Sequence, residues 1–273
     1  MPPWQSLVHG KVKIDIDPSM AGRLEVIFEF GCGTATGCTL YYLLHYPRSI
    51  CICIDRDVDK EFVLSHLPPE VHNRVFFESE DVGELTLEKL EAFARKYAKA
   101  GLERVTRAHW SPCCRPNSEA SRGYHRDMLG NPRTDFAALT DEIFEKGCQL
   151  LRQLTRRCTR ICITVENPVS ATFPHLTGVR KLLRDPRWRL LAGSHCSNLC
   201  SADTGDWPQK DTYWLTFGVV RKFHLDLCDF DCKMLIDGTD RHKVVLCSGS
   251  SVLPDQHVIR DPYMKGLLPL GVF

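Results

Sequence analysis

The sequence predicts an α/β protein with a doubly wound, mostly parallel sheet. The observation behind this prediction is a regular alternation of strand-like and helix-like segments through the first 220 residues. Apolar runs typical of strands cover 24–30, 50–55, 74–78, 104–110 and 160–165. Amphipathic periodicity typical of helices covers 36–45, 86–99 and 135–157. Strands that alternate with helices indicate an open sheet with helices on both faces.

Each segment carries its own local signal. The first strand-like run ends at Gly31-Cys32-Gly33, which indicates a strand that enters a tight turn. Segment 86–99 places its apolar residues on one helical face, and segment 135–157 does the same over a longer span. The last two strand-like runs, 188–196 and 213–220, are expected to form an antiparallel pair.

Three parts are expected along the chain. Residues 1–220 would form the main domain, 221–256 a small Cys/His-rich insert, and 257–273 a tail that returns to the main domain. The insert is polar, with little periodicity, and this separates it from the segments before it.

Composition narrows the class of protein. The chain has 273 residues, of which 43% are hydrophobic and 25% charged, as in ordinary globular domains. No apolar run approaches the roughly 18 residues of a membrane span, and the first residues do not resemble a secretory signal. We therefore expect an intracellular protein without membrane contact, nuclear if the source is eukaryotic.

The chain contains fourteen cysteines, which is a high count. A disulfide framework is not expected in an intracellular chain of this size. We expect most of the thiols to pack in the core, a few to bind a metal, and one to act as a nucleophile.

Charge is unevenly distributed although the net charge is only +1. Residues 55–91 hold eleven acidic and four basic residues, whereas 95–133 hold nine basic and three acidic residues. The basic stretch surrounds Cys114, where it would favour an anionic polymer and a thiolate. Arg115 and Arg126 are near enough in sequence to lower the pKa of the cysteine or to hold a phosphate. A solvated helix face with a charged loop explains the same composition equally well.

Polar residues at the strand ends indicate a nucleoside site. The turn Glu29-Phe30-Gly31-Cys32-Gly33-Thr34 follows the first strand, and Asp55 ends the second. Glycines let a ligand approach the backbone, and an acid at this position suits a ribose diol. Asp81, beyond the third strand, suits an adenine amino group, although a surface acid is an equal alternative. No phosphate-binding Gly-x-x-x-x-Gly-Lys-Ser/Thr string is present, so a nucleoside such as S-adenosylmethionine fits better than a triphosphate.

Two strings about fifty residues apart predict the chemistry. Ser111-Pro112-Cys113-Cys114-Arg115 and Val165-Glu166-Asn167-Pro168 come at the ends of neighbouring strand-like runs. A thiolate can add to carbon 6 of a pyrimidine, which activates carbon 5 toward an electrophilic methyl group. A carboxylic acid can donate to the ring nitrogen that gains charge. A structural thiol and a capping carboxylate are the alternatives for the two residues taken singly.

These strings resemble those of cytosine-5 DNA methyltransferases, and most closely the short, divergent branch found in phages and algae. Pro112-Cys113-Cys114 with Ser118 resembles the family's Pro-Pro-Cys string, and Glu166-Asn167-Pro168 resembles its Glu-Asn-Val. Phe28 to Gly33 resembles its Phe-x-Gly-x-Gly turn. Lys210 and Thr212 resemble the Lys-x-Thr of the divergent branch.

The resemblance implies a Rossmann-like methyltransferase sheet, S-adenosylmethionine as cofactor, and DNA whose target cytosine is flipped out of its stack. It implies that Cys114 is the nucleophile. Cys113 remains the alternative for the attacking thiol. The residues expected around the reaction are Cys114, Arg115, Glu166, Asn167 and Lys210. Those expected at the cofactor are Phe30, Gly31, Gly33, Thr34, Asp55, Asp81 and Pro112.

Two alternatives to a DNA methyltransferase remain open. The same chemistry can run on RNA or on a pyrimidine nucleotide, and the short recognition segment after Phe217 favours this. A catalytically silent nucleic-acid-binding relative would keep the fold without the reaction.

The insert predicts a structural zinc site. Cys228, Cys232, His242 and Cys247 offer two pairs of ligands that can close a tetrahedron. A small segment with little apolar content gains stability from such a metal. Cys196 and Cys200 could replace one pair, and free cysteines are the alternative.

Overall fold

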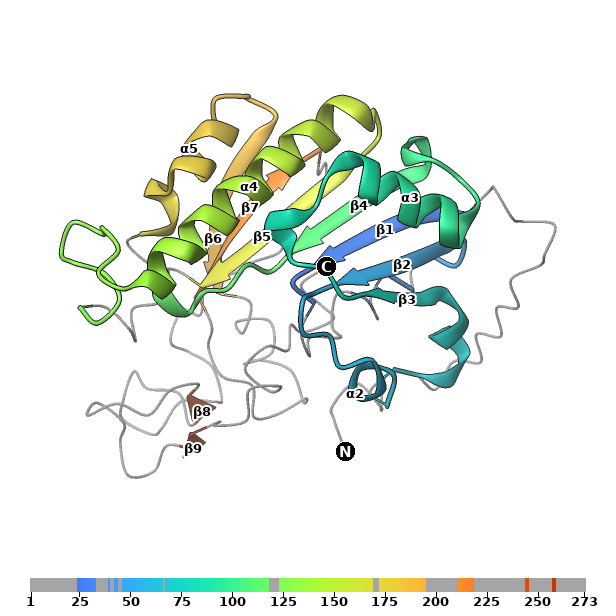
Figure 1. Cartoon of the computed structure of the whole chain (residues 1–273), viewed down its shortest axis with the longest axis horizontal. Helices are drawn as coiled ribbons and strands as arrows, with labels where there is room; N and C mark the ends of the chain where they lie inside the picture. Colours follow the sequence, from blue (N-terminus) through green and yellow to red (C-terminus); the bar gives the residue numbers. More distant parts are fainter. Residues whose placement is uncertain are drawn as a thin grey trace.

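The computed structural model describes residues 24–32, 39, 42–43, 46–65, 67–117, 123–168, 172–194, 211–218, 244–245 and 257–258. They form a seven-stranded sheet in the order β3-β2-β1-β4-β5-β7-β6 (Figure 1). The strands are β1 (Glu25–Phe30), β2 (Ser49–Ile54), β3 (Val75–Glu78), β4 (Val105–Trp110), β5 (Cys162–Pro168), β6 (Trp188–Ser194) and β7 (Asp211–Phe217). Strands β1 to β5 pair in parallel, and β7 pairs antiparallel with both β5 and β6. This confirms the Rossmann-like, mostly parallel sheet.

Three helices lie over one face of the sheet: α3 (Leu87–Ala98), α4 (Asp135–Arg157) and α5 (Thr177–Leu182) (Figure 1). A short helix, α2 (Lys60–Ser65), contributes Val63 to the core on the opposite face. Because the sheet is covered on both sides, β2 is buried along its whole length.

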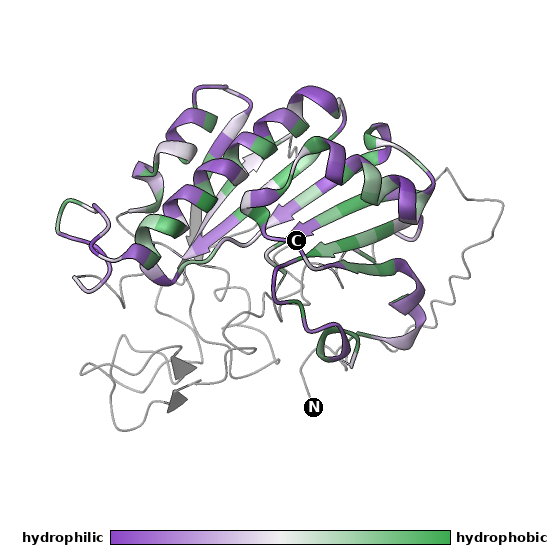
Figure 2. Cartoon of the chain, viewed as in Figure 1, coloured by the Kyte–Doolittle hydropathy of each residue, from purple (hydrophilic) through white to green (hydrophobic). Residues whose placement is uncertain are grey.

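The strands divide their side chains between two cores. Ile50, Ile52 and Ile54 of β2 pack under α3 and α4, whereas Cys51 and Cys53 pack on the other face. This follows from the alternation of side chains along a strand. Figure 2 shows the same division, with hydrophobic strands and with helices that are hydrophilic on the outside.

The helices begin where the sequence places a capping threonine. Thr86 accepts a hydrogen bond from the Lys89 N–H at 3.3 Å, and Thr134 accepts one from the Ala137 N–H at 3.3 Å. Helix α4 has the expected bounds, and α3 differs from its expected bounds by one residue at each end. In the expected helix 36–45, the described residues Thr39, Tyr42 and Leu43 are helical.

One strand departs from the expectation. Strand β5 does not end at Val165 but continues through Glu166, Asn167 and Pro168. The reason is tertiary, because these residues pair with Trp214, Tyr213 and Thr212 of β7. The Glu-Asn-Pro string therefore lies on the strand itself and not in the loop after it.

Two short pieces of the chain after Phe217 are described. Strand β8 (Val244–Val245) pairs in parallel with β9 (His257–Val258). The first residues of the expected tail thus pair with a segment of the expected insert. The described part of the chain holds no helix that is both long and apolar enough to cross a bilayer.

Candidate functional site

The turn after β1 is held between the two neighbouring strands. The Gly31 N–H donates to the Ile54 carbonyl at 2.8 Å, and the Ser111 N–H donates to the Phe30 carbonyl at 3.2 Å. Gly31 has φ +61°, and a Cβ atom there would lie 2.7 Å from the Ser111 carbonyl oxygen. The position therefore requires glycine both for its backbone angle and for its space.

A cavity of about 340 Å³ opens beside this turn. Gly31, Asp55, Asp81 and Pro112 all line it, although they come from four segments of the chain. Parallel strands place their carboxyl ends at one edge of the sheet, and this brings the four residues together. They are four of the seven residues that the sequence assigned to a cofactor.

The other three cofactor residues lie elsewhere or outside the described part of the chain. Phe30 is 1% exposed and packs in the core under α4. Phe30 therefore does not line the cavity, although the sequence assigned it to the cofactor. Gly33 and Thr34 lie outside the described residues.

The cavity has one acidic side and one apolar side. Asp81 uses one carboxylate oxygen to accept the Gly83 N–H at 2.7 Å, and its other oxygen lies 4.0 Å from the Arg56 guanidinium. Asp55 accepts the Asp57 N–H at 3.1 Å. The apolar side comes largely from α4, with Phe136 and Leu139 partly exposed to solvent. Such a cavity suits a ligand with hydroxyl or amino donors on one side and an apolar ring on the other.

The two neighbouring thiols occupy different environments. Cys113 is exposed and lines the cavity beside the glycine turn, whereas Cys114 is half-buried and does not line it. The Cys114 carbonyl accepts the Asn117 N–H at 2.9 Å, at the start of a short 3₁₀ turn, Arg115–Asn117. The Arg115 guanidinium lies 5.9 Å from the centre of the Phe136 ring, so this cation is near the cavity wall.

Glu166 and Asn167 lie near the carboxyl end of β5. The last register pair between β4 and β5 joins Trp110 to Val165, so Glu166 follows directly where Ser111 leaves β4. Glu166 is 6% exposed and Asn167 is 1% exposed. Both polar atoms of the Asn167 amide lack a hydrogen-bond partner among the described residues. A buried amide with unpaired atoms is costly and is a feature that a bound ligand can satisfy.

A buried polar chain beneath the Cys113-Cys114 segment was not foreseen from the sequence. His109 is fully buried, and its Nδ1 lies 2.7 Å from the Thr164 hydroxyl. Its Nε2 lies 3.0 Å from the Ser111 hydroxyl. The chain links β4, β5 and the residue that begins the Ser-Pro-Cys-Cys string, so it fixes the direction in which that string leaves the sheet.

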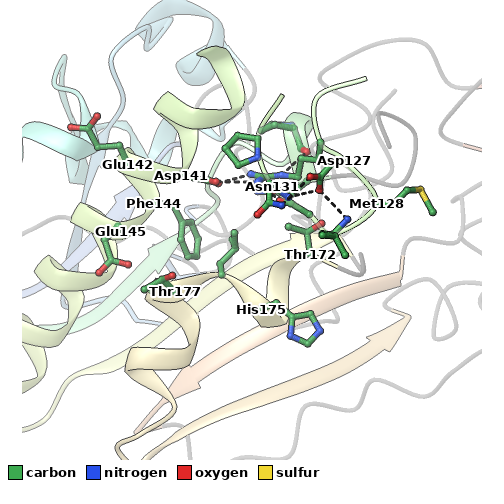
Figure 3. A pocket seen from close by; sticks show the side chains of 18 of the residues that line it. Asp127, Met128, Asn131, Asp141, Glu142, Phe144, Glu145, Thr172, His175 and Thr177 are labelled. Atoms are coloured by element: carbon green, nitrogen blue, oxygen red, sulfur yellow. Dashed lines mark hydrogen bonds and ion pairs between the residues drawn. The ribbon is translucent and has the colours of Figure 1, made fainter. Parts of the chain in front are cut away.

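A second cavity of about 820 Å³ lies between α4, α5 and the loop 123–133 (Figure 3). Phe144 borders both cavities. Arg126 was expected to hold a phosphate, but it is 3% exposed and braces the loop. Its guanidinium pairs with Asp141 and donates to the carbonyls of Pro116 at 3.1 Å and Gly130 at 2.9 Å. This internal use of its donors overturns the expected role.

The remaining predicted residues lie outside the described part of the chain. They are Lys210 and the four expected zinc ligands Cys228, Cys232, His242 and Cys247.

Comparison with known proteins leaves the family open. No protein-family model and no curated protein matches the sequence. Solved structures overlap weakly. An antibiotic-related methyltransferase has a TM-score of 0.39 at 10% identity and covers 74% of this chain and 94% of its own. TrmN from Thermus thermophilus has a TM-score of 0.38 at 10% identity, with 74% of this chain and 46% of its own. A human methyltransferase 10 domain containing protein has 0.38 at 8% identity, with 71% of each chain. The fold assignment rests on the observed strand order and not on these overlaps.

Proposed function

We propose that this chain is an S-adenosylmethionine-dependent methyltransferase that acts on carbon 5 of cytosine in DNA through a cysteine adduct. One observation supports the proposal most strongly. The expected cofactor residues Gly31, Asp55, Asp81 and Pro112 share a cavity with a thiol of the expected nucleophile string.

The cavity has the chemistry of a nucleoside site. Asp55 is positioned for a ribose diol and Asp81 for an adenine amino group, while the apolar face of α4 suits the ring. Close approach to the backbone is possible at Gly31, where no Cβ intervenes. S-adenosylmethionine would supply an electrophilic methyl group on a sulfonium. In the proposal, these residues bind S-adenosylmethionine.

The protein side of the reaction needs a thiolate and an acid. In the proposal, the Cys114 thiolate adds to carbon 6 while Glu166 donates a proton to the ring nitrogen that gains charge. Once carbon 5 is methylated, loss of its proton would expel the thiolate and restore the ring. Asn167, whose two amide atoms have no partner among the described residues, is suited to hold the base edge. Arg115 supplies positive charge near the thiol, and Lys210 would contact the nucleic acid.

The two thiols are separable by their surroundings. Cys113 faces the cavity that holds the expected cofactor residues, which favours it as an alternative nucleophile. Cys114 remains the first assignment from the family resemblance. Each thiol leads to a different result on substitution, so the assignment is decided by experiment.

The test is transfer of labelled methyl from S-adenosylmethionine to a panel of cytosine-containing DNA, RNA and free pyrimidine nucleotide. The proposal expects label in DNA cytosine, lost in Cys114→Ser and retained in Cys162→Ser, a half-exposed thiol at the opposite end of β5. Loss in Cys113→Ser with retention in Cys114→Ser moves the nucleophile to Cys113. Label in RNA alone, or in the free nucleotide alone, would mean that this molecule and not DNA is the substrate. Binding of nucleic acid without any transfer contradicts the enzymatic proposal.

A further inference from the structure

A group of metal-binding side chains lies inside the core, behind the glycine turn. Glu29 of β1 is in register with Cys53 of β2, and Cys51 precedes Cys53 by two residues on the same face. Both cysteines belong to the core on the face opposite α3 and α4. The three side chains therefore meet on one side of two adjacent parallel strands.

The ligand atoms are close enough to share one ion. A carboxylate oxygen of Glu29 and the sulfurs of Cys51 and Cys53 all lie within 4.8 Å of one another. The two sulfurs are 4.0 Å apart, and the Cys51 sulfur is 3.9 Å from Glu29 Oε2. Zinc–sulfur bonds of about 2.3 Å in a tetrahedron place sulfurs about 3.8 Å apart. For the two sulfurs, a contraction of about 0.2 Å suffices.

The carboxyl group of Glu29 is in an unfavourable place without a cation. Glu29 is 2% exposed, and Cys51 and Cys53 are at most 1% exposed. Its hydrogen-bond partners among the described residues are Thr39 and Cys51, neither of which carries positive charge. A divalent cation would offset the cost of the buried charge.

A fourth ligand is within reach. Cys32 lies in the glycine turn, is 2% exposed, and belongs to the same core cluster as Cys51 and Cys53. The Thr39 hydroxyl lies 3.5 Å from the Cys53 sulfur and 3.6 Å from the Cys51 sulfur, so it covers one side of the group. With Cys32, the group would offer three thiols and one carboxylate, the number of ligands that closes a structural zinc site.

We propose that Glu29, Cys51 and Cys53, with Cys32 as the fourth ligand, form a structural zinc site within the main domain. On binding, the thiols and the carboxyl group lose their protons and four coordinate bonds form. The site ties the end of β1 and the turn at Gly31 to β2. It is separate from the zinc set expected at Cys228, Cys232, His242 and Cys247, and it does not depend on the proposed reaction.

Zinc content per chain, measured by mass spectrometry of purified full-length protein, tests the site. We expect one zinc to be lost in Cys53→Ser and retained in Cys148→Ser. Cys148 is a matched control, because it is also 2% exposed but lies on α4, outside the cluster. Cys228→Ser accounts for any zinc held by the insert. Equal zinc content in Cys53→Ser and Cys148→Ser overturns the proposal.

A second measurement covers the case in which Cys53→Ser does not fold. Glu29→Gln keeps the shape of the side chain, and its zinc affinity is measured by competition with a chromophoric chelator. We expect a loss of at least about tenfold relative to Cys148→Ser. Cobalt-loaded wild-type protein should also show a thiolate charge-transfer band, which weakens in Cys51→Ser. Unchanged affinity together with an unchanged band contradicts the site.

Discussion

At the scale of the residue, the strictest requirement falls on Gly31. Its φ is +61°, and any Cβ at this position would come within 2.7 Å of the Ser111 carbonyl oxygen, which leaves no room for another side chain. The left-handed conformation costs a non-glycine residue about 1–2 kcal/mol before any clash. The glycine turn therefore packs directly against the first residue of the Ser-Pro-Cys-Cys string.

Gly31→Ala is expected to weaken S-adenosylmethionine binding by at least about tenfold, which corresponds to about 1.4 kcal/mol. Isothermal titration calorimetry measures the change. The control is Gly123→Ala, where φ is +85° but no atom lies within 4 Å of the new Cβ. Equal affinity in the two variants would show that the turn does not hold the cofactor.

Among the described cysteines, the exposed thiol of Cys113 should be the first to react in the native protein. Burial raises the pKa of Cys158 to about 11, so less than about 1% of that thiol is ionised at pH 8. We expect iodoacetamide at pH 8 to modify Cys113 much faster than Cys158, as mapped by peptide mass spectrometry. S-adenosylhomocysteine should protect Cys113 if the proposed cofactor site is correct, because Cys113 lines the cavity assigned to it. Alkylation at an unchanged rate with the ligand present would place the cofactor elsewhere.

The sequence anticipates the residues that strand ends bring together, and it misses those joined only by the fold. Gly31, Asp55, Asp81 and Pro112 each follow a recognisable strand, so their meeting is predictable. His109 and Thr164 are 55 positions apart, and no local pattern marks their hydrogen bond. The same holds for Glu29 and Cys51, whose contact depends on the register of β1 and β2.

At the scale of the element, α4 is positioned by its contact with β4. Gly147 of α4 faces the Trp110 ring, and a Cβ there would overlap the ring edge. The Trp110 ring is also stacked on Phe144, with the ring centres 5.0 Å apart. The helix that walls both cavities thus packs on the residue that immediately precedes the Ser-Pro-Cys-Cys string.

Gly147→Ala is expected to lower the free energy of unfolding, although alanine favours helix. The overpacking cost of about 1–3 kcal/mol outweighs the gain of about 1 kcal/mol from replacing glycine. Urea unfolding followed by circular dichroism measures the difference. The exposed α4 position Gln149→Ala serves as the control and should stay near wild type. A more stable Gly147→Ala protein would contradict this packing.

An ion pair between Arg126 and Asp141 ties the loop 123–133 to α4. Arg126 is almost fully buried, and its partner Asp141 is 30% exposed on α4. Figure 3 shows Asp141 among the residues that line the larger cavity, with dashed lines at its carboxylate. Removing the negative charge leaves a buried guanidinium without its partner, which is destabilising even though solvent screens part of the effect.

Asp141→Asn should open this loop to trypsin. We expect cleavage after Arg133 to become about tenfold faster, which corresponds to a local destabilisation of about 1.4 kcal/mol. Glu142→Gln is the control, since Glu142 neighbours Asp141 but pairs with Lys146 at the surface. The same cleavage rate in both variants would mean that the ion pair does not order the loop.

The length of β5 shows where element prediction fails. Its apolar run ends at Val165, and the polar residues beyond it are typical of a loop. Pairing with β7 extends the strand through Pro168, and that pairing comes from a segment more than forty residues later. Helices α3 and α4, by contrast, carry their own caps and periodicity, so their bounds are predictable.

At the scale of the whole molecule, the strand order places the chemistry at one edge. Strands β1 and β4 are neighbours in the sheet, although β2 and β3 lie between them in the sequence. The carboxyl ends of β1, β2 and β4 therefore lie at one edge of the sheet (Figure 1). Residues that follow these strands line one cavity. This strand order brings the glycine turn, the two acids and the thiol string close together, as in other open α/β sheets.

The central claim is that a thiol of this edge bonds covalently to cytosine during methyl transfer. The most direct measurement is incubation of the protein with S-adenosylmethionine and 5-fluorocytosine DNA, followed by mass mapping of the adduct. We predict a stable protein–DNA adduct at the Pro112–Arg115 segment, absent when Cys113 and Cys114 are both replaced by serine. Methyl transfer to cytosine carbon 5 without an adduct, or an adduct that survives the double substitution, would contradict the account.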